Sequence, residues 1–112
     1  MSQAVLRIDR LPEGALDAAA TFHSEWRPRV AALLHDAEAL AIVVPPAPYD
    51  HADWRQAAAR DLARAVAPKR ANLIAGRDEP AIAAAVAYLA AAPGVTGQYL
   101  PVDGNGAGDP LD

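Results

Sequence analysis

The sequence has 112 residues and a formal net charge of -4. This length suits one domain, and the acidic balance gives no electrostatic footprint for nucleic acid or an anionic membrane. Without cysteine the chain has no disulfide, thiol nucleophile or thiolate metal site, and it lacks the roughly 18-residue apolar run of a membrane span. We therefore expect a cytoplasmic protein with no nucleic-acid or membrane partner.

The first segment with strand character is the short apolar run at residues 4–9. Residues 14–23 then have helical composition, and residues 26–35 resume it around Pro28. Proline cannot continue a helix without the loss of a hydrogen bond. We therefore predict two helical pieces, or one kinked helix, with Pro28 in the first turn of the second piece.

The clearest strand is the continuous apolar run at residues 39–44, which Pro45 and Pro46 end. An uninterrupted run of this kind is typical of a strand covered on both faces, as in parallel sheets. A long helix is predicted for residues 51–67. Asp50 is a candidate cap for this helix, because its carboxylate could accept the free amide donors of the first turn.

A third strand is predicted at residues 72–76, and a last helix follows it. The spacing i, i+3, i+4, i+7 of a core-facing helix stripe is met by Ile82, Ala85, Val86 and Leu89. Residues 95–105 then contain a glycine-bounded turn, a short strand with apolar residues at its centre, and a second glycine-rich turn. We predict that this segment supplies the last strand of the sheet.

The predicted order is β-α-β-α-β-α-β, which indicates an α/β fold. Strands that alternate with helices imply a mostly parallel four-stranded sheet covered by helices, in a small Rossmann-like arrangement of two or three layers. We assign residues 1–104 to this single domain and expect the glycine-rich residues 105–112 to form a flexible C-terminal tail.

Several segments of the second half form a recognisable series. Residues 62–68, 72–76 and 81–90 are similar to the end of the fifth helix, the following strand and the last helix of the classical short-chain dehydrogenase/reductase family. The most specific match is Val95-Thr96-Gly97-Gln98 with Val102-Asp103-Gly104, which resembles the terminal threonine-glycine-glutamine and valine-aspartate-glycine signature of that family. Residues 30–44 resemble its fourth helix and fifth strand by pattern alone. The resemblance implies a Rossmann-like fold and a truncated member of the family.

The chemistry of that family depends on motifs that this sequence does not repeat. No glycine-rich phosphate motif follows the first predicted strand. Counted back from Pro68, the catalytic tyrosine and lysine of the family should fall near Pro48 and Ala52. Tyr49 is one residue away, but Asp53 stands four residues beyond it, and a carboxylate disfavours the phenolate that a lysine would stabilise. Tyr49 is the single catalytic candidate, and we expect no bound cofactor.

Histidines give no sign of a metal site. His23, His35 and His51 lie in separate segments without the i, i+3 or i, i+4 spacing of paired ligands, so we assign them structural or solvent-exposed roles.

In the family that this chain resembles, the long helix and the last helix-strand unit are oligomer contact surfaces. We therefore predict a non-catalytic domain that forms a homo-oligomer, or docks onto a related dehydrogenase as an accessory subunit. An exposed sheet edge and an alanine-rich helix both favour such an association. The predicted interface residues are Trp54, Ala58, Leu62, Ala65, Val86, Leu89, Tyr99 and Leu100.

Two alternatives stay open. The first is a degenerate NAD(P)-dependent oxidoreductase that acts on a small carbonyl or hydroxy compound, with Tyr49 as proton donor. The second is a small-ligand binding module that uses the crevice at the carboxyl ends of the strands, around Pro45, Pro46 and Gly76.

Overall fold

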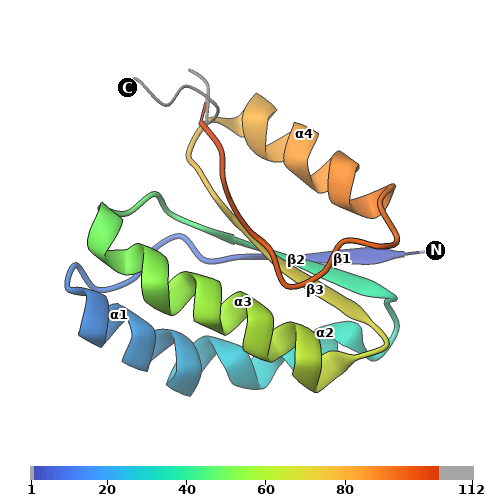
Figure 1. Cartoon of the computed structure of the whole chain (residues 1–112), viewed down its shortest axis with the longest axis horizontal. Coiled ribbons are helices and arrows are strands. Elements are labelled where there is room, and N and C mark those ends of the chain that lie inside the picture. The colour runs from blue at the N-terminus through green and yellow to red at the C-terminus, as the bar shows by residue number, and fades with distance from the viewer. Residues whose placement is uncertain (1, 104–112) are drawn as a thin grey trace.

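The computed structural model describes residues 2–103 and shows one parallel sheet between two layers of helices (Figure 1). The strands are β1 (Gln3–Arg7), β2 (Ala39–Val44), β3 (Arg70–Ala75) and β4 (Tyr99–Pro101). They lie in the order β1-β2-β3-β4, and each pair of neighbours is parallel. The predicted α/β class and Rossmann-like parallel sheet are confirmed. The predicted tail at residues 105–112 lies outside the described residues.

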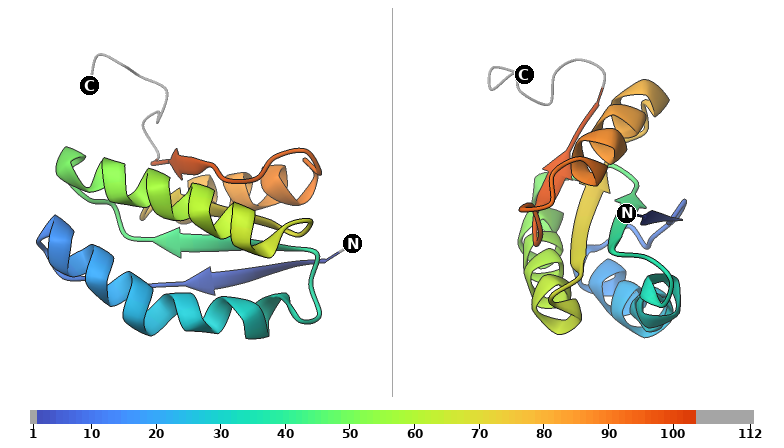
Figure 2. Two further views of the ribbon diagram at one scale, coloured as in Figure 1. Left: turned by 60° about the horizontal axis from the view of Figure 1, so that its bottom comes forward. Right: turned by 90° about the vertical axis from the view of Figure 1, so that its right-hand side faces the viewer.

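The segment around Pro28 is one bent helical rod. α1 (Ala15–Thr21) continues through a π-helical turn and a 3-10 turn at Arg27–Arg29 into α2 (Val30–Leu34). Figure 2 shows this rod beside α3 (Ala52–Val66) on the same face of the sheet. Pro28 is the second residue of the 3-10 turn, where it has no N–H to donate to the preceding turn and the regular α-helix is interrupted. Of the two predicted forms, the kinked helix is the one found.

The predicted cap of α3 is wrong. A 3-10 turn at Tyr49–His51 precedes the helix, so His51 takes the N-cap position and no side chain there bonds a first-turn amide. Asp50 lies in the middle of that turn and is exposed. A capping side chain needs an extended backbone at its own position, which the turn does not provide to Asp50.

The sheet separates two cores. Leu40, Ile42 and Leu73 face α1, α2 and α3, where Phe22 is fully buried among them. The alternate residues of the same strands face α4 (Glu79–Ala90), and this second core is formed by Ala41, Val43, Ile74, Ile82 and Leu89. All six residues of β2 are buried, which explains its continuous apolar run.

The three connections between parallel strands do not have the same handedness. The helices between β1 and β2 and between β2 and β3 lie on one face, and these crossovers are right-handed (Figure 2). α4 lies on the other face while the strand order continues in the same direction, so the crossover from β3 to β4 is left-handed. Connections between parallel strands are right-handed in almost all proteins, and this last unit is an exception. As a result, α4 is separated from the other helices by the sheet, whereas β4 contacts α3 through Tyr99 and Arg55. No helix among residues 2–103 is long and apolar enough to cross a membrane.

Candidate functional site

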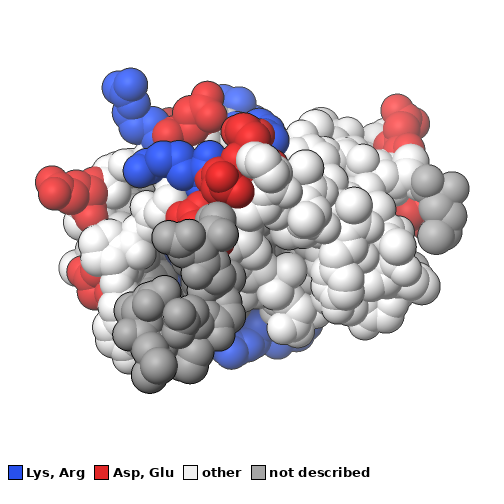
Figure 3. Space-filling model, turned by 90° about the horizontal axis from the view of Figure 1, so that it is seen from above, with Lys and Arg blue, Asp and Glu red and all other residues white. Residues whose placement is uncertain are grey.

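Two adjoining hollows lie at the carboxyl ends of the strands. The larger has a volume of about 340 Å³ and is lined by the loops that follow β1 and β2, together with His51, Arg55 and Arg77. The smaller, about 120 Å³, lies between the ends of β1, β2 and β3 and the start of α4. Figure 3 shows charged side chains gathered over this end of the molecule, whereas α4 carries no charged residue after Glu79. The crevice predicted around Pro45, Pro46 and Gly76 has this location.

Arg55 is the least expected residue of the larger hollow, which we call the arginine crevice. Its side chain is 1% exposed, although it lies on the long helix that borders solvent. Nη1 donates to the carbonyl of Pro45 at 2.8 Å and to the hydroxyl of Tyr99 at 3.3 Å. The guanidinium also lies 5.4 Å from the ring centroid of Trp54 and 5.9 Å from that of Tyr99. Its Nε is buried without a hydrogen-bond partner among the described residues.

His51 is a structural residue at the back of the same crevice. Trp54 Nε1 donates to its Nδ1 at 3.1 Å, so the ring proton is on Nε2, which then donates to the carbonyl of Glu13 at 2.9 Å. The side chain is 3% exposed. The hydrogen bond to Glu13 connects the loop after β1 to the start of α3. No group of three or more potential metal-ligating side chains occurs within residues 2–103.

Tyr49, the catalytic candidate, does not line either hollow. Its side chain is 92% exposed and projects from the turn before α3. Asp53, four residues later, is also exposed. The structure therefore does not bring Tyr49 together with the crevice, and its catalytic role stays a prediction.

The threonine-glycine-glutamine segment is held by the side chain of Asn72, which is 1% exposed. Its Nδ2 donates to the carbonyl of Val95 at 3.1 Å, and its Oδ1 accepts from the main-chain N–H of Gln98 at 2.9 Å. Gly97 has φ +76°, a conformation that L side chains rarely adopt, and this explains the glycine of the motif. These residues position β4 beside β3 and do not reach the crevice.

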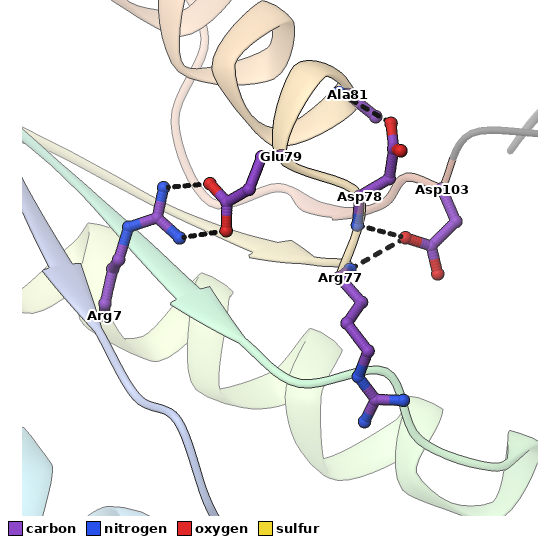
Figure 4. Close-up of polar contacts among 6 residues, drawn as sticks. All are labelled: Arg7, Arg77, Asp78, Glu79, Ala81 and Asp103. Atoms are coloured by element: carbon purple, nitrogen blue, oxygen red, sulfur yellow. Dashed lines mark hydrogen bonds and ion pairs between the residues drawn. The ribbon is translucent and has the colours of Figure 1, made fainter.

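Asp103 of the valine-aspartate-glycine segment closes the end of the sheet (Figure 4). Its carboxylate accepts the main-chain N–H groups of Arg77 at 2.8 Å and Asp78 at 3.2 Å, and these hydrogen bonds lower the pKa of Asp103. Asp78 in turn caps α4 by accepting the N–H of Ala81 at 3.0 Å. The motif therefore ties β4 to the start of α4.

Gly76, at the end of β3, allows the backbone at Val102 to approach it closely. A Cβ there would lie 2.2 Å from the carbonyl oxygen of Val102, so no other residue fits without a backbone shift.

A second surface lies between α4 and β4, and we call it the α4–β4 face. Its groove of about 550 Å³ is lined by Ala81, Ala84, Ala85, Tyr88, Leu100, Pro101, Val102 and Asp103. Of the predicted interface residues, Leu100 lies in this groove and Val86 is half-buried on α4, whereas the half-buried side chain of Tyr99 packs on the other face of the sheet beside Arg55.

The other predicted interface residues lie in or beside the long helix and the core. Ala58, Leu62 and Leu89 are buried in the two cores of this chain, and Ala58, Leu62 and Ala65 also line a groove of about 340 Å³ beside α3. Trp54 is half-buried and Ala65 is exposed. The contact role of the accessible residues stays a prediction.

The described residues do not fit the pyrophosphate of a dinucleotide. Such a group needs free amides in a glycine-rich turn that opens a helix. Here the loop after β1 carries Pro12, which has no N–H, and the anionic Glu13. The strand order also has no reversal, so the described sheet has no topological switch point.

A parallel sheet with helices on both faces and a crevice at the carboxyl ends of its strands defines a Rossmann-like α/β domain. A family model described as short chain dehydrogenase-like protein matches residues 6–102, and the chain belongs to this family. The predicted resemblance is thus confirmed, and it extends well before Leu62, where the recognisable motifs begin. Comparison with curated proteins gave no match, and comparison with solved structures gave none either.

Proposed function

We propose that this short-chain dehydrogenase-like domain acts by association through its α4–β4 face, with a second copy or with a related dehydrogenase subunit, and not by dehydrogenation. The observation that supports this most is the absence of charge around α4. No Asp, Glu, Lys, Arg or His occurs between Glu79 and Asp103.

The apolar surface of this segment is only partly buried by the rest of the chain. α4 buries only Ile82 and Leu89, whereas Tyr88 is 56% exposed and Ala84 is exposed. A helix that is apolar all round is normally covered on all sides. β4 adds a second need, since it is a three-residue edge strand whose outer hydrogen-bonding groups have no neighbouring strand in the described sheet. A second copy related by a two-fold axis would cover the helix and the edge together.

The candidate chemistry gives little support to an enzyme. Tyr49 lies in solvent, the residue four positions after it is Asp53 and not a lysine, and the loop at Pro12 and Glu13 does not suit a pyrophosphate. We therefore expect no saturable change in NADH or NADPH fluorescence when the chain is added. A saturable change that Tyr49→Phe leaves intact would still contradict the proposal, because it would show a working cofactor site.

Association is tested by sedimentation velocity of three chains over the micromolar range. We expect the unchanged chain to dimerise and Ala84→Glu, in the middle of the α4–β4 face, to stay monomeric. Ala57→Glu is the matched control, because Ala57 is an exposed alanine on the outer side of α3. A chain that remains monomeric throughout would contradict self-association. Co-purification with a related dehydrogenase, lost in Ala84→Glu but kept in Ala57→Glu, would then support the accessory-subunit form.

A further inference from the structure

We infer that the arginine crevice binds a small anion, with a carboxylate or phosphate group held by Arg55. This inference does not depend on association through the α4–β4 face, which lies on a different part of the molecule. It concerns a side chain that neither the catalytic motifs nor the terminal signature of the sequence includes.

The first argument is the number of unused donors on Arg55. A guanidinium has five N–H donors. Nη1 uses its two on the carbonyl of Pro45 and the hydroxyl of Tyr99. Nε is buried with no hydrogen-bond partner among the described residues, and both hydrogen bonds from this guanidinium to described residues come from Nη1. The edge of the guanidinium formed by Nε and Nη2 is the edge that binds a carboxylate or phosphate through two parallel hydrogen bonds.

The second argument is the charge of Arg55. A buried arginine is normally paired with a carboxylate, because an unpaired ion in the interior is strongly unfavourable. The ion pairs among residues 2–103 are Arg7 with Glu79, His35 with Asp36, and Arg64 with Asp61, so none involves Arg55. An anionic ligand would supply the missing negative charge.

The third argument is the balance of charges around the crevice. Besides Arg55, it is lined by Arg10 and Arg77, against the carboxylates of Asp9 and Glu13. Three arginines against two carboxylates leave a net positive lining. Figure 4 shows the guanidinium of Arg77 extended away from Asp103, which binds only the main chain of this residue. Among the described residues, the side chain of Arg77 has no hydrogen bond or ion pair, and it lines the crevice.

The walls select for a small ligand. Pro45, Pro46 and Pro48 form one rim, and proline has no N–H to offer a ligand. The arginines are therefore the charged donors of the crevice, and the guanidinium of Arg55 is positioned by its contacts with the rings of Trp54 and Tyr99. A volume of about 340 Å³ suits a small molecule with one anionic group.

Nuclear magnetic resonance of the full-length 15N-labelled chain tests the site through the Nε–H signal of Arg55. The chain is titrated separately with inorganic phosphate and with acetate, and each titration is matched by sodium chloride of equal ionic strength. We expect a saturable shift in the millimolar range with one or both anions and none with chloride, and the stronger of the two arms identifies the ligand class. Arg55→Lys keeps the charge but lacks the planar fork, so anion binding followed on the signals of the neighbouring main chain should weaken about tenfold.

Two further variants keep the test decisive if Arg55→Lys does not fold. Arg77→Ala removes an exposed side chain of the crevice and retains the main-chain N–H that binds Asp103, so it should weaken binding a few-fold in a folded chain. Arg60→Ala removes an exposed arginine on the same helix away from the crevice and should leave binding unchanged. The inference is overturned if the unchanged chain shows no saturable shift, if chloride produces the same shift, or if Arg77→Ala and Arg60→Ala bind alike.

Discussion

Gly76→Ala tests whether the close approach of β4 to the end of β3 is needed for stability. The added Cβ would lie 2.2 Å from the carbonyl oxygen of Val102 and 3.1 Å from its Cγ2. The backbone of Val102 would have to move by roughly 1 Å to restore van der Waals distance. That movement would break the hydrogen bond of 2.7 Å from the N–H of Val102 to the carbonyl of Ala75.

The expected effect of Gly76→Ala follows from these two contributions. Overpacking typically destabilises by about 1–3 kcal/mol, and a lost backbone hydrogen bond by about 1 kcal/mol. We therefore expect the free energy of unfolding to fall by about 3 kcal/mol. At about 4 °C for each kcal/mol in a domain of this size, the melting temperature should fall by about 12 °C.

Urea and thermal unfolding measure the change, at one fixed protein concentration because association would shift the apparent stability. Gly94→Ala is the matched control, since no atom lies within 4 Å of a Cβ at that position. It should change the free energy of unfolding by less than about 0.5 kcal/mol. If Gly76→Ala is as stable as Gly94→Ala, the steric reasoning is refuted.

Three further variants test, by urea unfolding, other hydrogen bonds that hold the last helix and strand in place. Arg70→Met removes hydrogen bonds of 2.9 and 3.0 Å to carbonyls at the end of α4 and should lose about 2 kcal/mol, whereas the exposed Arg64→Ala should lose less than about 0.5 kcal/mol. Asn72→Ala leaves a carbonyl and an amide of the glycine turn unpaired and should lose about 2 kcal/mol; its control, Gln98→Ala, keeps the main-chain N–H. The pKa of Asp103 is lowered from 3.8 in the folded state, so its stabilisation is present above that value and is lost as pH falls through the lower folded pKa. Asp103→Asn should flatten the loss of stability below about pH 4. Equal losses within either control pair, or an unchanged acid slope for Asp103→Asn, would contradict the assigned roles.

The strands could be predicted because a strand buried on both faces has a continuous run of apolar residues in the sequence. β2 has the bounds predicted from the run at residues 39–44, since all its side chains are buried on one face or the other. β3 begins two residues before the predicted 72–76, because Arg70 is a charged residue inside a buried strand. The arginine is accommodated by the carbonyls at the end of α4, a contact between segments distant in sequence.

Arg55 shows why the candidate site was only partly predictable. The spacing of Arg55 with Ala58, Ala59 and Leu62 is that of a core stripe, and this was the one signal in the sequence. An arginine is ordinarily assigned to the solvent side of a helix, because its burial requires partners from other segments. Those partners, the carbonyl of Pro45 and the hydroxyl of Tyr99, meet it only in the folded chain. The crevice could be placed from the strand ends, whereas its charge could not.

The left-handed last connection divides the interior unequally. Fourteen buried residues form the core beneath α1, α2 and α3, and five form the core beneath α4. Because α4 buries side chains only in the smaller core, it can open locally while the rest of the native structure persists, whereas β4 is also held to the larger core through Tyr99. Such a partial opening would uncover Ile82 and Leu89 together with the strand residues that they cover, so the surface proposed for recognition contains the helix best able to exchange with the matching helix of a neighbouring molecule.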